Sequence, residues 1–157
     1  MTMIWLDQPA APACESTQAE GEKLEVVVVY TGVKQTLAAL RAGACLARGL
    51  AARIRLVVPQ LVPFPAQLDE PLVRTDFVER KFRTLAEQAA IETNVDIRLC
   101  RDWETGVLQG LKPGSRVVLG ARMRWWPGAR EGRLVRALQK RGHQVLLVGS
   151  TGEARNA

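Results

Sequence analysis

A short segment of the chain joins an apolar run to a group of arginines and tryptophans. Residues 117–128 read VVLGARMRWWPG, and helical spacing begins at about residue 130. In an open α/β sheet, ligands bind in strand-to-helix loops of this kind. Arginines near the N-terminus of a helix can pair with phosphate or carboxylate groups in a bidentate manner. The residues in or just after this loop that could bind an anion are Gly120, Arg122, Arg124, Gly128, Arg130 and Arg133.

The same residues have a structural interpretation that needs no ligand. The arginines can point into solvent, and Trp125 and Trp126 can close a sheet edge or a subunit contact. Exposed tryptophan beside arginine is also common in protein interfaces. The residue types alone leave both interpretations open.

The charge of the chain is unevenly distributed. The formal net charge is +6, and residues 98–143 carry eleven Arg and Lys against three Asp and Glu. A basic half can favour nucleotides, nucleic acid, anionic lipid or an acidic protein partner, and solvated helix faces give the same pattern. Nucleic acid is the least favoured of these partners, because aromatic residues are few and no known RNA motif interleaves them with the arginines.

Motifs of the common catalytic and metal sites do not occur in the sequence. Residues 31–36 read TGVKQT in place of GxGxxG, and no Gly-Lys-Ser/Thr of a phosphate-binding loop is present. Three widely spaced cysteines and one histidine support neither a zinc site nor a disulfide framework. His143 lies at a turn, where it is expected to cap a helix. We therefore expect no catalytic residue and no metal site, and the sequence names no cofactor.

Hydrophobic periodicity predicts alternating strands and helices. Strands are expected over 24–30, 54–58, 95–100, 115–120 and 144–149, and helices over 36–53, 73–93, 103–111 and 130–141. Pro59 is expected to stop the second strand, Asn94 to end the second helix, and Asp102 to cap the third. This order predicts one doubly wound, five-stranded parallel sheet. A switch point between the first and fourth strands would place Thr31 and Gly32 beside Gly120.

The ends of the chain have a different composition. Residues 1–22 are predicted to be a flexible tail, residues 23–150 a single α/β domain, and residues 151–157 a second flexible tail. The first tail lacks the apolar run of a signal peptide, and no stretch is long enough for a membrane span. With three unpaired cysteines, these features favour a cytoplasmic location.

The predicted elements together resemble the universal stress protein family. The resemblance rests on the five-strand order, the Thr-Gly step after the first strand, the segment LAALRAGACLARGLAARIRLV over 37–57, and the fourth strand over 117–120. It covers about residues 24–149. It implies a universal stress protein-like fold, which is also called adenine nucleotide alpha hydrolase-like.

The resemblance also assigns positions to a nucleotide site. In ATP-binding members, an Asp after the first strand contacts the nucleoside, and a loop of pattern Gly-x2-Gly-x9-Gly-Ser/Thr wraps the phosphates. Here the Asp position is Thr31, the first glycine is Gly120, and the second glycine falls at Met123. The last pair falls at Arg133 and Leu134, although Gly132 could supply the third glycine in a loop one residue shorter. Side chains at these positions obstruct a phosphate cradle.

Two functions follow from these positions. The first is a non-enzymatic module that acts in the stress response through dimerisation and partner or ligand binding, without ATP binding of the family type. The alternative is a binding protein or weak hydrolase for an adenine nucleotide or another phosphorylated ligand held by the arginine-rich loop. The residues assigned to a ligand or cofactor are Thr31, Gly32, Gly120, Arg122, Arg124, Gly128, Arg130 and Arg133.

A homodimer is also implied by the resemblance. The strand over 144–149 ends the sheet in the family order, and it contains an apolar VLLV core without Pro or Lys. An open strand edge of this kind favours pairing with a second chain. An anionic small molecule and an acidic protein remain the other candidate partners.

Overall fold

The computed structural model describes residues 24–68, 74–88, 92–122, 129–149 and 154–156. The elements in chain order are β1 (Glu25–Val29), α1 (Val33–Leu50), β2 (Arg53–Leu61), α2 (Thr75–Glu87), β3 (Thr93–Cys100), α3 (Trp103–Gln109), β4 (Arg116–Ala121), α4 (Arg130–Lys140), β5 (Gln144–Gly149) and β6 (Ala154–Asn156). No helix among these residues is long and apolar enough to cross a membrane.

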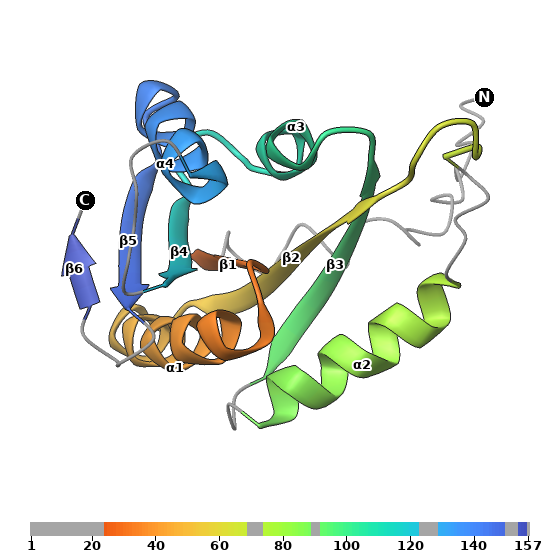
Figure 1. Ribbon diagram of the computed structural model, residues 1–157. Helices are drawn as coiled ribbons and strands as arrows, with labels where there is room; N and C mark the ends of the chain where they lie inside the picture. The colour runs from red at the N-terminus through yellow and green to blue at the C-terminus, as the bar shows by residue number, and fades with distance from the viewer. Residues whose placement is uncertain (1–23, 69–73, 89–91, 123–128, 150–153, 157) are drawn as a thin grey trace, which may run out of the picture.

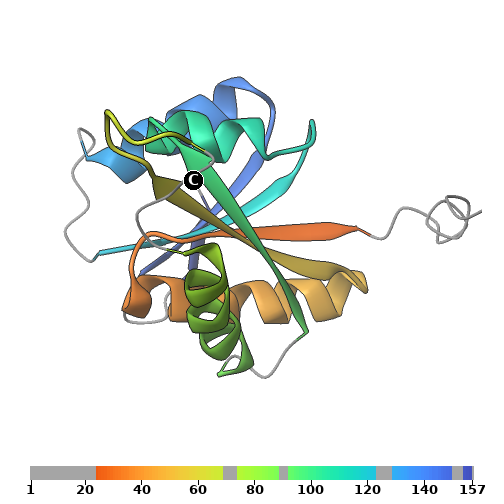
Figure 2. The same ribbon diagram turned by 90° about the vertical axis from the view of Figure 1, so that its right-hand side faces the viewer.

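One sheet forms the centre of the fold. Its strand order is β3-β2-β1-β4-β5-β6, and the first five strands are parallel. Helices α1 and α2 lie on one face and α3 and α4 on the other (Figures 1 and 2). The chain reverses direction across the sheet between β3 and β4, so the switch point lies between β1 and β4 as expected from the sequence. The predicted doubly wound α/β fold is confirmed.

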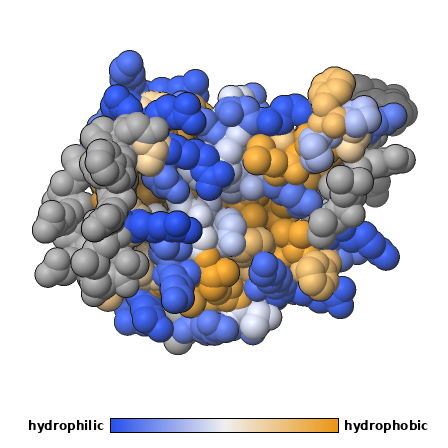
Figure 3. Space-filling view, in the orientation of Figure 1, coloured by the Kyte–Doolittle hydropathy of each residue, from blue (hydrophilic) through white to orange (hydrophobic). Residues whose placement is uncertain are grey.

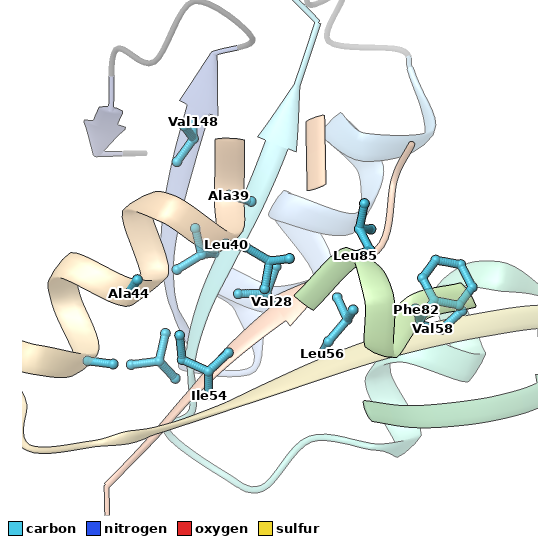
Figure 4. Close-up of a cluster of buried hydrophobic side chains, with 13 residues drawn as sticks. Val28, Ala39, Leu40, Ala44, Ile54, Leu56, Val58, Phe82, Leu85 and Val148 are labelled. Atoms are coloured by element: carbon cyan, nitrogen blue, oxygen red, sulfur yellow. The ribbon is translucent and has the colours of Figure 1, made fainter. Parts of the chain in front are cut away.

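Strand β1 is buried because helices cover both of its faces. Val26 and Val28 pack with α1 and α2, whereas Val27 and Val29 pack with α3 and α4. On the first face, Leu40 of α1 and Leu56 of β2 meet Val28 in the cluster drawn in Figure 4. A run of β-branched residues suits such a strand, since every position must fill a core.

Strand β2 runs through Pro59, contrary to the prediction that Pro59 would stop it. The pairing of β1 with β2 ends at Val57, so no β1 residue pairs with Pro59. On its other side Pro59 pairs with Arg98, and the ladder with β3 continues to Leu61. The missing N–H of proline is tolerated where one neighbouring strand has already ended.

The boundaries of α1 and α2 also differ from the prediction. Helix α1 begins at Val33, because the N–H of Thr36 already donates to Gly32 O at 2.8 Å. Helix α2 ends at Glu87, and the predicted helical residue Thr93 starts β3 instead, paired with Ile54. Asn94 therefore lies inside a strand, where sheet pairing overrides its tendency to end a helix.

Part of the expected C-terminal tail forms a strand. Residues 154–156 make β6, which pairs antiparallel with β5 across Leu146, Leu147 and Val148. The prediction that β5 ends the sheet was wrong for this part of its edge. A three-residue strand has too weak a hydrophobic pattern to be recognised from sequence.

Candidate functional site

The carboxyl ends of β1 and β4 form the switch point of the sheet. Thr31, which follows β1, donates a hydrogen bond from Oγ1 to Gly120 O at 2.8 Å. The backbone N–H of Thr31 donates to Thr36 Oγ1 at 3.3 Å. The structure thus brings Thr31 and Gly120 together as the sequence predicts, and the polar groups of Thr31 bond to the chain itself.

Gly120 allows α1 to approach β4 closely. A Cβ atom built on Gly120 would lie 2.1 Å from Gln35 O and 2.5 Å from Gln35 C, both of which are backbone atoms of α1. No side chain fits that space. Gly120 is itself buried inside β4. The chain's own helix therefore fills the space above this glycine.

Gly32, the N-cap residue of α1, also lies against Gln35. A Cβ atom there would be 2.6 Å from Gln35 Oε1, the end of a flexible side chain. The φ of Gly32 is 167°, an extended conformation that other residues adopt. The backbone conformation of Gly32 thus does not require glycine, and the side chain of Gln35 is what limits the space for a larger residue.

Helix α4 includes the positions at which the family pattern ends. The helix begins at Arg130, Gly132 is buried within its first turn, and the N–H of Arg133 donates to Ala129 O at 3.1 Å. A backbone N–H that closes a helical turn cannot also donate to a phosphate. At this position the exposed guanidinium side chain of Arg133, and not its backbone N–H, is available to a ligand.

Two of the candidate arginines lie beside α3. The guanidinium of Arg130 stacks over the Trp103 ring, 4.3 Å from its centroid. The hydrogen bond that the Thr105 N–H donates to Asp102 lowers the pKa of that carboxyl, and the charge of Arg133 lowers it further. Arg130 thus contacts the first residue of α3, and the charge of Arg133 acts on the N-cap residue of that helix. Arg122 is exposed at the end of β4, and Arg124 and Gly128 lie outside the described residues.

Asp102 and Trp103 link β3 to this region. Asp102 caps α3 as predicted, with Oδ2 accepting from Thr105 N at 2.8 Å. Trp103 is only 5% exposed and packs in the α3–α4 core. Its indole is covered by protein, so Trp103 is a core side chain at the start of α3. Among the described residues, no three His, Cys, Asp or Glu side chains are grouped to hold a metal ion.

Arg101 forms a clasp that sequence reasoning missed. Its guanidinium donates to Val62 O at 2.9 Å and to Ala66 O at 2.7 Å, and lies 4.7 Å from the Phe64 ring centroid. Phe64 is 86% exposed. The clasp holds the proline-rich segment after β2 against the end of β3. The sequence signals a stiff loop here, but it does not indicate which cation holds the loop.

A shallow groove also lies between the start of α1 and α2. Its volume is about 330 Å³, and its lining comprises Val33, Lys81, Phe82, Thr84, Leu85 and Gln88. Hydrophobic side chains reach the surface near the centre of the face in Figure 3, with hydrophilic residues around them. The helical spacing that predicts α2 includes Phe77, Phe82 and Leu85. Phe82 and Leu85 are core residues, whereas Phe77 is 60% exposed, and the spacing gives no sign of a groove.

His143 is buried between α4 and β5. Its backbone N–H donates to Leu138 O at 3.1 Å, so it helps to end α4 as expected. The residue is 8% exposed, and among the described residues Nδ1 has no hydrogen-bond partner. Burial lowers the pKa of His143, and the nearby charge of Arg141 lowers it further. The neutral imidazole is therefore the form that the fold accommodates.

This burial predicts a pH-dependent stability. Because the pKa of His143 is lower in the folded chain, the unfolded chain takes up the proton first as the pH falls. The stability that depends on neutral His143 is fully present above pH 6.5, the pKa of histidine in the unfolded chain, and decreases below it. The free energy of unfolding falls by at most about 1.4 kcal/mol per pH unit for one proton. We expect urea unfolding between about pH 7.5 and about pH 5.5 to show this loss. His143→Gln, which cannot titrate, should show a flatter profile, and equal slopes would contradict the assignment.

Comparisons with known proteins support the fold. No protein-family model matches the chain, and no curated protein matches it. The architecture is that of an open α/β sheet with its switch point between the first and fourth strands. A similar solved structure is described as a universal stress protein in complex with cAMP. The TM-score is 0.50 at 17% sequence identity, and the alignment covers 81% of this chain and 97% of the other. The chain thus has a universal stress protein-like fold.

Proposed function

We propose that the chain is a non-enzymatic, universal stress protein-like module that works by assembly and by binding, without ATP binding of the family type. The observation that carries this proposal is the closed switch point. Thr31 Oγ1 bonds to Gly120 O, and the backbone of Gln35 lies against Gly120. The polar side chain that follows β1 is thus bonded to β4, and α1 packs directly against the glycine of β4.

The start of α4 supports the same proposal. A phosphate cradle needs several backbone N–H groups that converge on one point. The N–H of Arg133 bonds within the helix, and Met123 stands where the second glycine is needed. The arginine-rich loop gains less support as a replacement, because Arg130 lies over Trp103 and Arg133 lies near Asp102.

Calorimetric titration with MgATP tests the proposal. We expect no saturable binding in the micromolar range, because neither a carboxylate after β1 nor a glycine cradle after β4 is present. A cooperative thermal unfolding transition of the same sample serves as the control for folded protein. Micromolar affinity for MgATP would overturn the proposal. Parallel titration with cAMP, the ligand named for the similar structure, tests whether a smaller nucleotide binds instead.

The assembly that we propose is a homodimer through β5. The strand has buried Val145 and Val148, with Leu146 and Leu147 half-buried between them. Neither Pro nor Lys interrupts the six residues from Gln144 to Gly149. Strand edges without such residues favour pairing with another strand, although β6 pairs with residues 146–148 of this edge within one chain. Symmetric pairing of two β5 strands about a two-fold axis gives a closed dimer. Light scattering after size exclusion should give a mass of twice the 17.3 kDa of one chain.

A further inference from the structure

The outer edge of β5 is partly covered within a single chain. Strand β6 pairs Asn156 with Leu146, Arg155 with Leu147, and Ala154 with Val148. These pairs involve three of the six residues of β5. On its inner side, β5 pairs with β4 along all six residues. The outer ladder is therefore half as long as the inner ladder.

Strand β6 differs from the other strands in how it joins the sheet. It is antiparallel, whereas β1 to β5 are parallel, and only four residues separate it from β5. A local antiparallel pair forms without a crossover helix and without help from a second chain. Figure 1 shows β6 beside β5 at the margin of the sheet, with no helix drawn over it. Strand β6 is thus joined to the sheet by its backbone ladder with β5.

The remainder of β5 is firmly held. Val148 and Leu146 pack with the α1–α2 core, and Val145 and Leu147 pack with the α3–α4 core. Removal of β6 would therefore open a backbone edge without loosening the strand that carries it. Each open N–H and C=O group would then need a new partner.

From this arrangement we propose that β6 is a displaceable cover of the β5 edge, and that its release makes the edge available to β5 of a second copy of this chain. The proposal rests on the dimer proposed above and adds its regulation. Two β5 strands paired antiparallel can form a ladder of up to six residues each, twice the length of the β5–β6 ladder. Short ladders open more readily than long ones, because each hydrogen bond adds little net free energy.

The test uses the full-length chain with Arg155→Pro. Proline at the centre of β6 removes a backbone donor and disfavours the ladder. Arg155→Ala keeps the N–H group and is the matched control for loss of the side chain. In dilute wild-type protein, hydrogen exchange should show slow exchange for the amides of 146–148 that β6 protects. Arg155→Pro should speed their exchange, whereas Arg155→Ala should leave it unchanged.

Sedimentation velocity over a range of concentrations then measures the dimer. We expect Arg155→Pro to lower the dimer dissociation constant about tenfold or more relative to wild type and to Arg155→Ala. Within that dimer, amide exchange over 144–149 should be slow again, which would locate the interface on β5. Ala154→Pro gives a second, independent break in β6.

The outcomes separate this inference from the proposed function. If wild type forms a dimer and Arg155→Pro has the same dissociation constant, the proposal that β6 covers the dimer edge is overturned, while the proposed dimer stands. Fast exchange over 146–148 in the dilute wild-type chain would also overturn the cover. Proteins that stay monomeric in every variant would overturn both. Species larger than a dimer in Arg155→Pro would overturn the proposal that the released β5 edge pairs with one second copy of the chain.

Discussion

Gly120→Ala is expected to lower the free energy of unfolding by about 3 kcal/mol, at the upper end of the range for overpacked sites. The new Cβ atom would lie 2.1 Å from Gln35 O, so either α1 or β4 must move. Strand β4 is held by its pairing with both β1 and β5, and α1 is held by its buried side chains in the core cluster. Urea unfolding followed by circular dichroism measures the change, and the melting temperature should fall by about 6 to 12 °C.

Gly49→Ala is the matched control for this substitution. Gly49 lies in α1 and is exposed. Within the part of the chain that the structure describes, no heavy atom beyond the neighbouring backbone of its own helix lies within 4 Å of the place that a methyl group would take. Alanine favours helix over glycine by up to about 1 kcal/mol, so this variant should be slightly more stable than wild type. A Gly120→Ala variant as stable as wild type would show that α1 does not lie against this glycine.

Trp103→Ala is expected to lower the free energy of unfolding by about 3 to 5 kcal/mol, the range for large aromatic residues in a core. Trp103 is 5% exposed and lies at the start of α3, in the cluster that joins α3 and α4 to the sheet. Its loss would leave a cavity and would remove the surface on which Arg130 stacks. Chemical denaturation at neutral pH provides the measurement.

Arg130→Ala separates the core role of Trp103 from the surface stack. Arg130 is exposed, and a cation over an aromatic ring at such a site contributes about 0.5 to 1 kcal/mol. We therefore expect a small loss of stability from Arg130→Ala and a much larger one from Trp103→Ala. Equal losses would mean that the indole acts mainly as a platform for the arginine.

The sequence carries enough information to predict the parallel sheet. A run of four valines in β1 and the alternation of apolar strands with amphipathic helices are strong signals, since each spans a whole element. The position of the switch point follows from the strand order, and it correctly places Thr31 beside Gly120. These predictions depend on long patterns and tolerate errors at single residues.

Features that depend on a neighbouring strand could not be predicted from sequence. Pro59 is a strand breaker by type, yet β2 passes through it because β1 has ended at that level. Asn94 has the composition of a helix end, yet it pairs with Arg55 in the ladder between β2 and β3. In both cases the local preference of one residue is weaker than the sum of ladder and packing contacts.

The candidate site shows the same limit. Its arginines are conspicuous in the sequence, but the partners that position them are distant along the chain. Arg130 meets Trp103, and Arg101 reaches back to Val62 and Ala66. No spacing rule connects such pairs, because they meet only after the sheet has formed. The sequence could therefore name the arginines without predicting which surface they share.

The hydrogen bond between Thr31 and Gly120 joins residues 89 positions apart. The pairing of β1 with β4 can therefore be completed only after the chain has been synthesised beyond Gly120. Until then, the edge of β1 that faces away from β2 has no strand to pair with. Long-range parallel pairing is slow and exposes such edges to aggregation. The β1–β4 pairing, which joins the two halves of the sheet, thus lengthens the interval during which the nascent chain exposes an open strand edge.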